Sequence, residues 1–255
     1  MIDTHVHFWD IHLKINTWVN NSNREDLKRS FTLDDYLQHY SKPEAIVTIE
    51  AADANKTLVE VEWIKQHIVD NTFGIKIKHM PYIDFLQAPD KFVQQLALFK
   101  NYSFVCGFRQ IFAYCEEDVT QSHNLVTHLK HNLALLKEKN YIFDCQMHPN
   151  QLLRMCDIFD ESGVAFVIDH AGMPKIDTKK GKQQWLDMLQ SYANTSAFFK
   201  LTEYAPEIIS GLLEYISIDK LLIGSNYPVS TQNETALLNS YITKNDINAH
   251  ALFKF

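Results

Sequence analysis

The sequence has little glycine and little proline, seven of each among 255 residues. This scarcity excludes collagen-like chains and Gly- or Pro-rich disordered chains. No stretch of about 18 apolar residues is present, so the sequence predicts no membrane span. Lys and Arg together number 24 against 31 Asp and Glu, which gives a net charge of −7. Because a basic excess is missing, we expect neither nucleic acid nor a membrane as a partner.

Cysteine is also scarce. The four cysteines form no C-x-x-C pair, which argues against a Cys-based zinc site. The opening MIDTHVHFWD lacks the basic and apolar regions of a signal peptide. No P-loop, G-x-G-x-x-G or G-x-S-x-G motif occurs. We therefore expect a cytoplasmic protein with reduced thiols and without a nucleotide-binding loop.

Strand-like and helix-like segments alternate along the whole chain. Eight short apolar runs, typical of parallel strands buried on both faces, are separated by segments of helical periodicity. The runs are Ile2–His7, Ala45–Ala51, Ile75–Ile83, Phe104–Arg109, Tyr141–Gln146, Val164–His170, Ala197–Thr202 and Lys220–Gly224. No linker composition interrupts them. We predict a single (β/α)₈ TIM barrel over residues 1–255 rather than an open doubly wound sheet.

The first strand carries two histidines at strand spacing. Alternation in a regular strand puts Asp3, His5 and His7 on one face. At the carboxyl end of a barrel strand, neutral imidazoles can bind a divalent metal or transfer protons. A polar strand end with two packed core histidines is the competing interpretation. The polar segment Trp9–Ser30 is expected to form a long loop over the same mouth.

Several segments, in chain order, share a pattern with one family. They are IDTHVHFWD at the start, VCGFRQIF at 105–112, FDCQMHPNQL at 143–152, FVIDHAGMP at 166–174, FFKLTEY at 198–204 and LLIGSNYPVS at 221–230. Together they resemble the amidohydrolase-related family of barrel hydrolases, and in particular its lactonase branch. The resemblance implies that an activated water hydrolyses a small substrate, which we expect to be a carboxylated lactone or a related cyclic ester. A homodimer is left open.

The resemblance also implies roles for individual residues. His5 and His7 match the H-x-H of the family, and His170 matches a histidine on strand six. In the wider family these histidines and a strand-eight aspartate hold one divalent metal, for which we expect zinc, whereas some lactonases work without metal. Arg109 matches an arginine that holds a substrate carboxylate or carbonyl, and Lys200 matches a lysine of the family.

The residues themselves leave alternatives open. Arg109 ends an apolar strand, and a buried guanidinium needs an anionic partner, either a substrate carboxylate or an internal one such as Glu50. Lys200 could stabilise an oxyanion or pair with a carboxylate. His170 is expected on an inward face, following Phe166 and Ile168. Two further residues, Gln146 and Tyr227, are expected to contact the substrate.

Strand eight departs from the family pattern. The motif G-S-D-[WY]-P reads Gly224-Ser225-Asn226-Tyr227-Pro228 here. An amide cannot accept a proton near pH 7, and a positioned base contributes about 10²- to 10⁴-fold to a rate. Glu203 or Glu50 could replace that base. If neither does, the chain is a silent descendant that binds an organic acid as a sensor or scaffold.

The same departure bears on metal. Without the strand-eight carboxylate, the site would have no anionic ligand and no base beside a metal-bound water, so we expect weak or absent metal. In that case His5, His7 and His170 would bind the substrate directly.

Overall fold

The computed structural model describes residues 1–115, 118–202, 205–230 and 235–255, and for residues 235–242 it describes the backbone only. All eight expected strands are present in these segments. They are β1 Ile2–Val6, β2 Ala45–Ile49, β3 Lys76–Met80, β4 Gly107–Ile111, β5 Ile142–Gln146, β6 Phe166–Ile168, β7 Phe198–Leu201 and β8 Leu221–Ile223. Every ladder between neighbouring strands is parallel.

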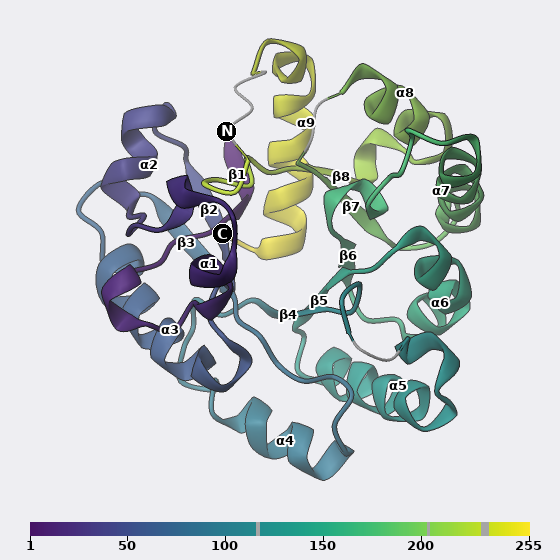
Figure 1. Ribbon diagram of the computed structural model, residues 1–255, viewed down its shortest axis with the longest axis horizontal. Coiled ribbons are helices and arrows are strands. Elements are labelled where there is room, and N and C mark those ends of the chain that lie inside the picture. Colours follow the sequence, from purple (N-terminus) through teal and green to yellow (C-terminus); the bar gives the residue numbers. More distant parts are fainter. Residues whose placement is uncertain (116–117, 203–204, 231–234) are drawn as a thin grey trace.

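Each strand is followed along the chain by a helix. The helices are α1 Thr17–Asn21, α2 Leu33–His39, α3 Thr57–Ile64, α4 Pro89–Ala97, α5 His123–Glu138, α6 Pro149–Ser162, α7 Lys179–Tyr192, α8 Pro206–Tyr215 and α9 Thr235–Phe253. Figure 1 shows helices α2 to α8 as an outer ring around the strands, with α9 between α2 and α8. Helix α1 belongs to the long connection between β1 and α2.

The strands close into a ring through two hydrogen-bonded seams. The ladders join β1 to β3 and β4 to β8 in sequence order. Val6 bridges Tyr227 at one seam, and His79 bridges Val105 at the other. At the first seam the His7 amide donates to the Tyr227 carbonyl over 2.8 Å. The predicted fold class, an α/β barrel of parallel strands, is confirmed.

Local sequence signals account for the helix ends. Thr32 and Asp35 form a reciprocal capping box at the start of α2. Pro149 occupies the first turn of α6, and Gly163 ends that helix with a φ of 62°, a left-handed conformation that glycine adopts without strain. These caps fix where the chain turns back towards the next strand.

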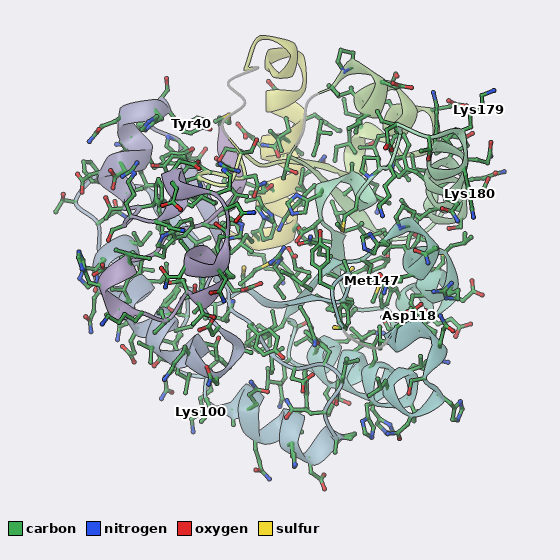
Figure 2. All side chains as sticks on the ribbon, in the orientation of Figure 1. Tyr40, Lys100, Asp118, Met147, Lys179 and Lys180 are labelled. Atoms are coloured by element: carbon green, nitrogen blue, oxygen red, sulfur yellow. The ribbon has the colours of Figure 1, made fainter. Side chains whose placement is uncertain are left out.

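The interior of the ring is apolar at one end and polar at the other. Side chains such as Ile2, Ala45, Ile142 and Leu222 fill the end where the strands begin. A larger core between strands and helices is rich in aromatic rings, including Phe143. Figure 2 shows Lys179 and Lys180 on the outer side of α7, away from both cores. The polar residues of interest gather at the carboxyl ends of the strands.

Some boundaries differ from the expected ones. Strand β4 begins at Gly107 rather than Phe104, and β6 ends at Ile168, before His170. The segment Trp9–Ser30 does not remain a plain loop, because it contains α1 and two 3₁₀ turns. No helix in the described part of the chain has the length and apolar character needed to cross a membrane.

The connection between β1 and α2 spans two neighbouring loops at the carboxyl end of the barrel. Trp18 Nε1 donates to the Ala51 carbonyl, after β2, over 2.6 Å. Arg24 donates to the Val229 carbonyl, after β8, over 3.3 Å. The segment therefore lies over the β2 and β8 side of the mouth.

Candidate active site

A buried polar cluster occupies the carboxyl ends of the strands. Its members come from six different strands or the residues just after them: His5, His7, Glu50, Arg109, Asp144, Gln146, Asp169, His170 and Lys200. His5, Asp144, Asp169 and Lys200 are fully buried, whereas Glu50 and Gln146 retain 9% and 8% exposure. Glu50 and Gln146 are therefore closer to solvent than the centre of the cluster.

A break in the β1 ladder sets the direction of the two histidines. The register shifts between Asp3 and Val6, so Asp3 does not share the inward face of His5. Instead, Asp3 accepts hydrogen bonds from the Tyr36 hydroxyl over 3.0 Å and from the Ser225 amide over 2.9 Å. The expected grouping of Asp3 with the histidines is wrong, because regular alternation does not survive this irregularity.

Arg109 joins three neighbouring elements. Its Nε donates to Asp169 Oδ2 over 2.7 Å, and its two terminal nitrogens donate to Glu50 Oε1 and Gln146 Oε1 over 2.6 Å each. Burial alone would lower the pKa of Arg109, but the carboxylates of Asp169, Glu50 and Asp144 reverse this effect and raise it. The guanidinium is therefore a permanent cation whose partners lie inside the protein.

Lys200 is the second buried cation. Its ammonium pairs with Asp144 and lies 3.2 Å from Asp169 Oδ1. Burial and the neighbouring Asp169 raise the pKa of Asp144 to about 7, although Lys200 and Arg109 oppose that rise. Three carboxyl groups, those of Glu50, Asp144 and Asp169, thus face the two buried basic side chains, Arg109 and Lys200. When all three are ionised, the cluster carries one excess negative charge and favours an added proton or metal ion.

The hydrogen bonds of His5 and His7 also favour an added proton or metal ion. His7 Nδ1 lies 3.0 Å from the Glu50 carbonyl and 3.2 Å from that of Ile49, so this nitrogen must carry a proton. The Nε2 atom of neutral His7 is therefore a bare acceptor, and it faces His5 Nε2 at 3.2 Å.

A neutral His5 can satisfy only one of its two contacts. Its Nδ1 lies 3.4 Å from Asp169 Oδ1, and its Nε2 lies 3.2 Å from His7 Nε2. With the proton on Nε2, a bare nitrogen faces a carboxylate; with the proton on Nδ1, two bare nitrogens face each other. A cation bound at the Nε2 atoms, or a second proton on His5, removes the conflict. Burial, the largest effect, lowers the pKa of His5 well below its ordinary value, which disfavours the second proton.

His170 completes the group of three histidines. It lies in a 3₁₀ turn with a φ of 53°, its ring centroid lies 5.0 Å from that of His5, and its Nδ1 is 2.7 Å from the Thr202 hydroxyl. Burial lowers the pKa of His170 to about 4, so the ring is neutral at pH 7. The expected inward face of Phe166 and Ile168 is wrong: Phe166 packs on Phe159 of α6, and the left-handed turn after β6 brings His170 inward.

The histidines and Asp169 offer donor atoms for a metal ion. Each Nδ1 has an oxygen neighbour, supplied by Asp169, by the Glu50 carbonyl and by Thr202, and such partners orient metal-binding imidazoles. His5, Asp169 and His170 also place one donor atom each within 4.8 Å of one another. Asp169 is therefore an anionic group beside the histidines that the sequence-based expectation did not include.

The site residues expected on strand eight, Asn226 and Tyr227, contribute less to the polar cluster. Asn226 is half-buried with a φ of 54°, and its backbone N–H donates to the His5 carbonyl over 2.8 Å. The Tyr227 ring points away from the cluster and packs against the rings of Tyr36 and Tyr40. There it lines a separate cavity of about 240 Å³, next to the end of α2 where Figure 2 labels Tyr40. Glu203 lies outside the described residues.

Two members of the cluster were missed by the sequence analysis. Asp144 shares an inward face with Gln146 on β5, a relationship that alternation along FDCQM already contains. Asp169 directly precedes His170, and its inward direction follows once β6 is known to end at Ile168. A buried lysine and a buried arginine also require carboxylate partners, which is a second signal for both aspartates.

Comparisons with known proteins concern the family and the fold. A family model described as amidohydrolase matches residues 2–239. A search of curated proteins finds no match. Among solved structures, the chain is similar to an amidohydrolase 2 from Bifidobacterium longum subsp. infantis, with a TM-score of 0.76 and 19% identity, covering 99% of this chain and 98% of the other.

Two further structures carry bound groups. A probable 2-pyrone-4,6-dicarboxylic acid hydrolase from Acinetobacter baumannii, with citric acid bound, has a TM-score of 0.68 and 17% identity over 100% of this chain and 99% of the other. An amidohydrolase from Burkholderia multivorans with bound zinc has a TM-score of 0.71 and 18% identity over 98% and 91%. At these identities the likeness concerns the fold. Since the family model spans nearly the whole chain, the chain belongs to the amidohydrolase family.

Proposed function

We propose that the protein is a hydrolase that opens a small carboxylated lactone, or a related cyclic ester, by attack of water. The observation that carries this proposal is the cluster of three neutral histidines and paired carboxylates at the carboxyl ends of the barrel strands. A pyrone is itself a cyclic ester, so the printed name of the Acinetobacter protein supports this substrate class.

We assign His5, His7 and His170 as the residues that would hold a metal ion. A divalent ion held by these residues would supply Lewis acidity and would reverse the excess negative charge of the cluster, which favours a carboxylated substrate. The residues around the ligands keep the rings in place: Asp169 lies beside His5, and Thr202 lies beside His170.

The proton acceptor is assigned to Glu50. Asn226 cannot accept a proton near pH 7, and Glu50 is the carboxylate of the cluster with the greatest exposure. Burial raises the pKa of Glu50, and Arg109 opposes this rise, so the group is more basic than an exposed glutamate. Glu50 takes a proton from the water molecule while the water oxygen bonds to the ester carbonyl carbon. The ring C–O bond then breaks, and the leaving oxygen takes up the proton that Glu50 holds.

Arg109 is assigned as a brace rather than as the substrate anchor. Its contacts to Asp169, Glu50 and Gln146 use one donor towards each neighbour inside the protein. Because Gln146 Oε1 already accepts from Arg109, its amide nitrogen is the group that can donate to a substrate oxygen.

A panel of sugar-acid lactones and pyrone carboxylates tests the function. We expect turnover of at least one compound, and Glu50→Gln should lower kcat by about 10²- to 10⁴-fold, while the variant amide can still accept from Arg109. Glu161→Gln, which changes an exposed glutamate of α6, serves as the matched control. Saturable binding without turnover across the panel would instead support the alternative of a silent binding protein, which the asparagine at position 226 favours.

A further inference from the structure

A second cavity lies at the opposite end of the barrel from the histidines. It has a volume of about 460 Å³ and lies between the first residues of the middle strands and the end of α9. Its lining comprises Lys78, Val105, Cys106, Lys137, Asn140, Tyr141, Ile142, Gly163, Ala165 and residues Ala251 to Lys254. We call it the basal cavity. The volume is in the range of small-molecule sites, about 300–1,000 Å³.

The charge of the basal cavity is opposite to that of the chain. Lys78, Lys137 and Lys254 line it, and no carboxylate side chain does so among the described residues. Within that same part of the chain, none of these three ammonium groups has an ion-pair partner. The protein as a whole carries a net charge of −7. A concave surface lined by one sign of charge concentrates the potential and attracts the opposite ion.

Ordinary structural roles explain only part of this arrangement. Lys137 follows a common pattern: a Cβ on Gly163 would lie 2.5 Å from its ammonium, so the ammonium lies at the carboxyl end of α6, where a cation is favoured. Lys78 has no such explanation. It is half-buried on β3, two residues before Met80, on the face that points into the apolar interior of the ring. An ammonium in that position gains stability from an anion beside it.

The donors and the walls indicate the class of ligand. All three cations are lysines, which bind phosphate as point charges, whereas planar carboxylate recognition favours the fork of arginine. Apart from Asn140, the remaining wall consists mainly of apolar and aromatic residues, with Val105, Ile142 and Phe253 among them. We propose that the basal cavity binds a small phosphomonoester with an apolar or aromatic body, its phosphate among the three lysines. This site is separate from the hydrolytic function proposed above.

Calorimetric titration with phenyl phosphate tests the proposal. Wild-type protein should bind close to one equivalent, more tightly than inorganic phosphate or phenol alone. Lys78→Met keeps the length of the apolar stem and removes the charge, and it should weaken binding about 10-fold or more, as expected for loss of a charge-assisted contact. Lys179→Met, on the outer side of α7 in Figure 2, removes the same charge elsewhere and should leave the affinity unchanged.

Further variants serve as controls for this titration. His170→Gln should leave phenyl phosphate binding unchanged, because His170 lies at the other end of the strands. Circular dichroism checks that Lys78→Met is folded, and Lys254→Met, at an exposed position, replaces it if it is not. The proposal is overturned by absent saturable binding, by a Lys78→Met affinity equal to wild type, or by loss of binding in His170→Gln. Equal affinity for inorganic phosphate and phenyl phosphate would overturn the assignment of an apolar body.

Discussion

Arg109 Nε donates to Asp169 Oδ2 over 2.7 Å, and both side chains are almost fully buried. Through this contact a residue of β4 fixes the carboxylate that lies 3.4 Å from His5. The same guanidinium holds Glu50 after β2. The orientation of His5 and the orientation of Glu50, the assigned proton acceptor, therefore both depend on Arg109.

Replacement of Arg109 should destabilise the protein strongly. Arg109→Met leaves Glu50 buried without its cation and Asp169 with Lys200 alone, and breaking such a buried pair typically costs about 3–5 kcal/mol of unfolding free energy. Urea denaturation measures the change. Arg154→Met is the matched control, because Arg154 pairs with Asp118 at the surface and should contribute about 1 kcal/mol or less. Equal losses in the two variants would contradict the bracing role.

Zinc should bind to the three histidines. Protein freed of metal by a chelator is expected to take up one equivalent of Zn²⁺, since the facing Nε2 atoms of His5 and His7 need a cation between them or a proton. His7→Gln should weaken zinc binding by about 10-fold or more, as loss even of an outer partner costs 10- to 100-fold. Competition with a chromophoric chelator measures the affinity. His123→Gln, at an exposed position on α5, is the control. If the protein takes up no zinc, the result supports the metal-free interpretation of the site.

The sequence predicted the strands well, since eight apolar runs separated by helical segments are a strong and redundant signal. It placed individual side chains less well wherever alternation stops. The irregularity in β1 turns Asp3 away from His5, and the left-handed residues after β6 turn His170 inward. Such local departures depend on packing between distant segments, which the spacing of residues along one strand does not record.

Buried charge pairing was only partly predictable. Glu50 was recognised as a partner for Arg109 because a buried guanidinium requires one. The requirement of Lys200 for Asp144 follows from the same rule, but it becomes specific only when β5 and β7 are known to lie on either side of β6. Tyr227 was expected in the site on resemblance alone, and its ring lies instead among aromatic residues near α2.

A buried glutamate links α3 to the loop that carries Glu50. Glu60 Oε1 accepts from the amides of Ala51 and Ala52 over 2.6 and 3.0 Å. Burial, with a smaller contribution from Glu50, raises the pKa of Glu60 from its ordinary 4.5 to about 8. The folded state therefore holds this proton more tightly than the unfolded chain does.

Stability should consequently depend on pH through Glu60. The contribution of the neutral carboxyl is fully present below about pH 4.5 and is lost as the pH rises through about 8. Glu60→Gln keeps an acceptor for both amides and cannot ionise, so its unfolding free energy should improve relative to wild type between pH 5 and pH 9. Urea unfolding at several pH values measures the trend, with the exposed Glu161→Gln as control. A pH-independent difference for Glu60→Gln would show that its carboxyl does not titrate in this range.

Asn226→Asp separates two accounts of the proton acceptor. If Glu50 is the base, the wild type already turns over, and a fourth carboxylate beside a cluster with excess negative charge should help little or reduce the rate by like-charge repulsion. The backbone tolerates the change, because aspartate, like asparagine, adopts the left-handed conformation found here, with a φ of 54°. Steady-state kinetics on the best lactone, for wild type, Asn226→Asp and Glu50→Gln, measures the effect. A gain of about 10²-fold in Asn226→Asp would show instead that Asn226 is a degenerate base and that Glu50 has not replaced it. A lack of activity of both wild type and Asn226→Asp on every lactone would favour the alternative of a non-enzymatic binding protein over both accounts.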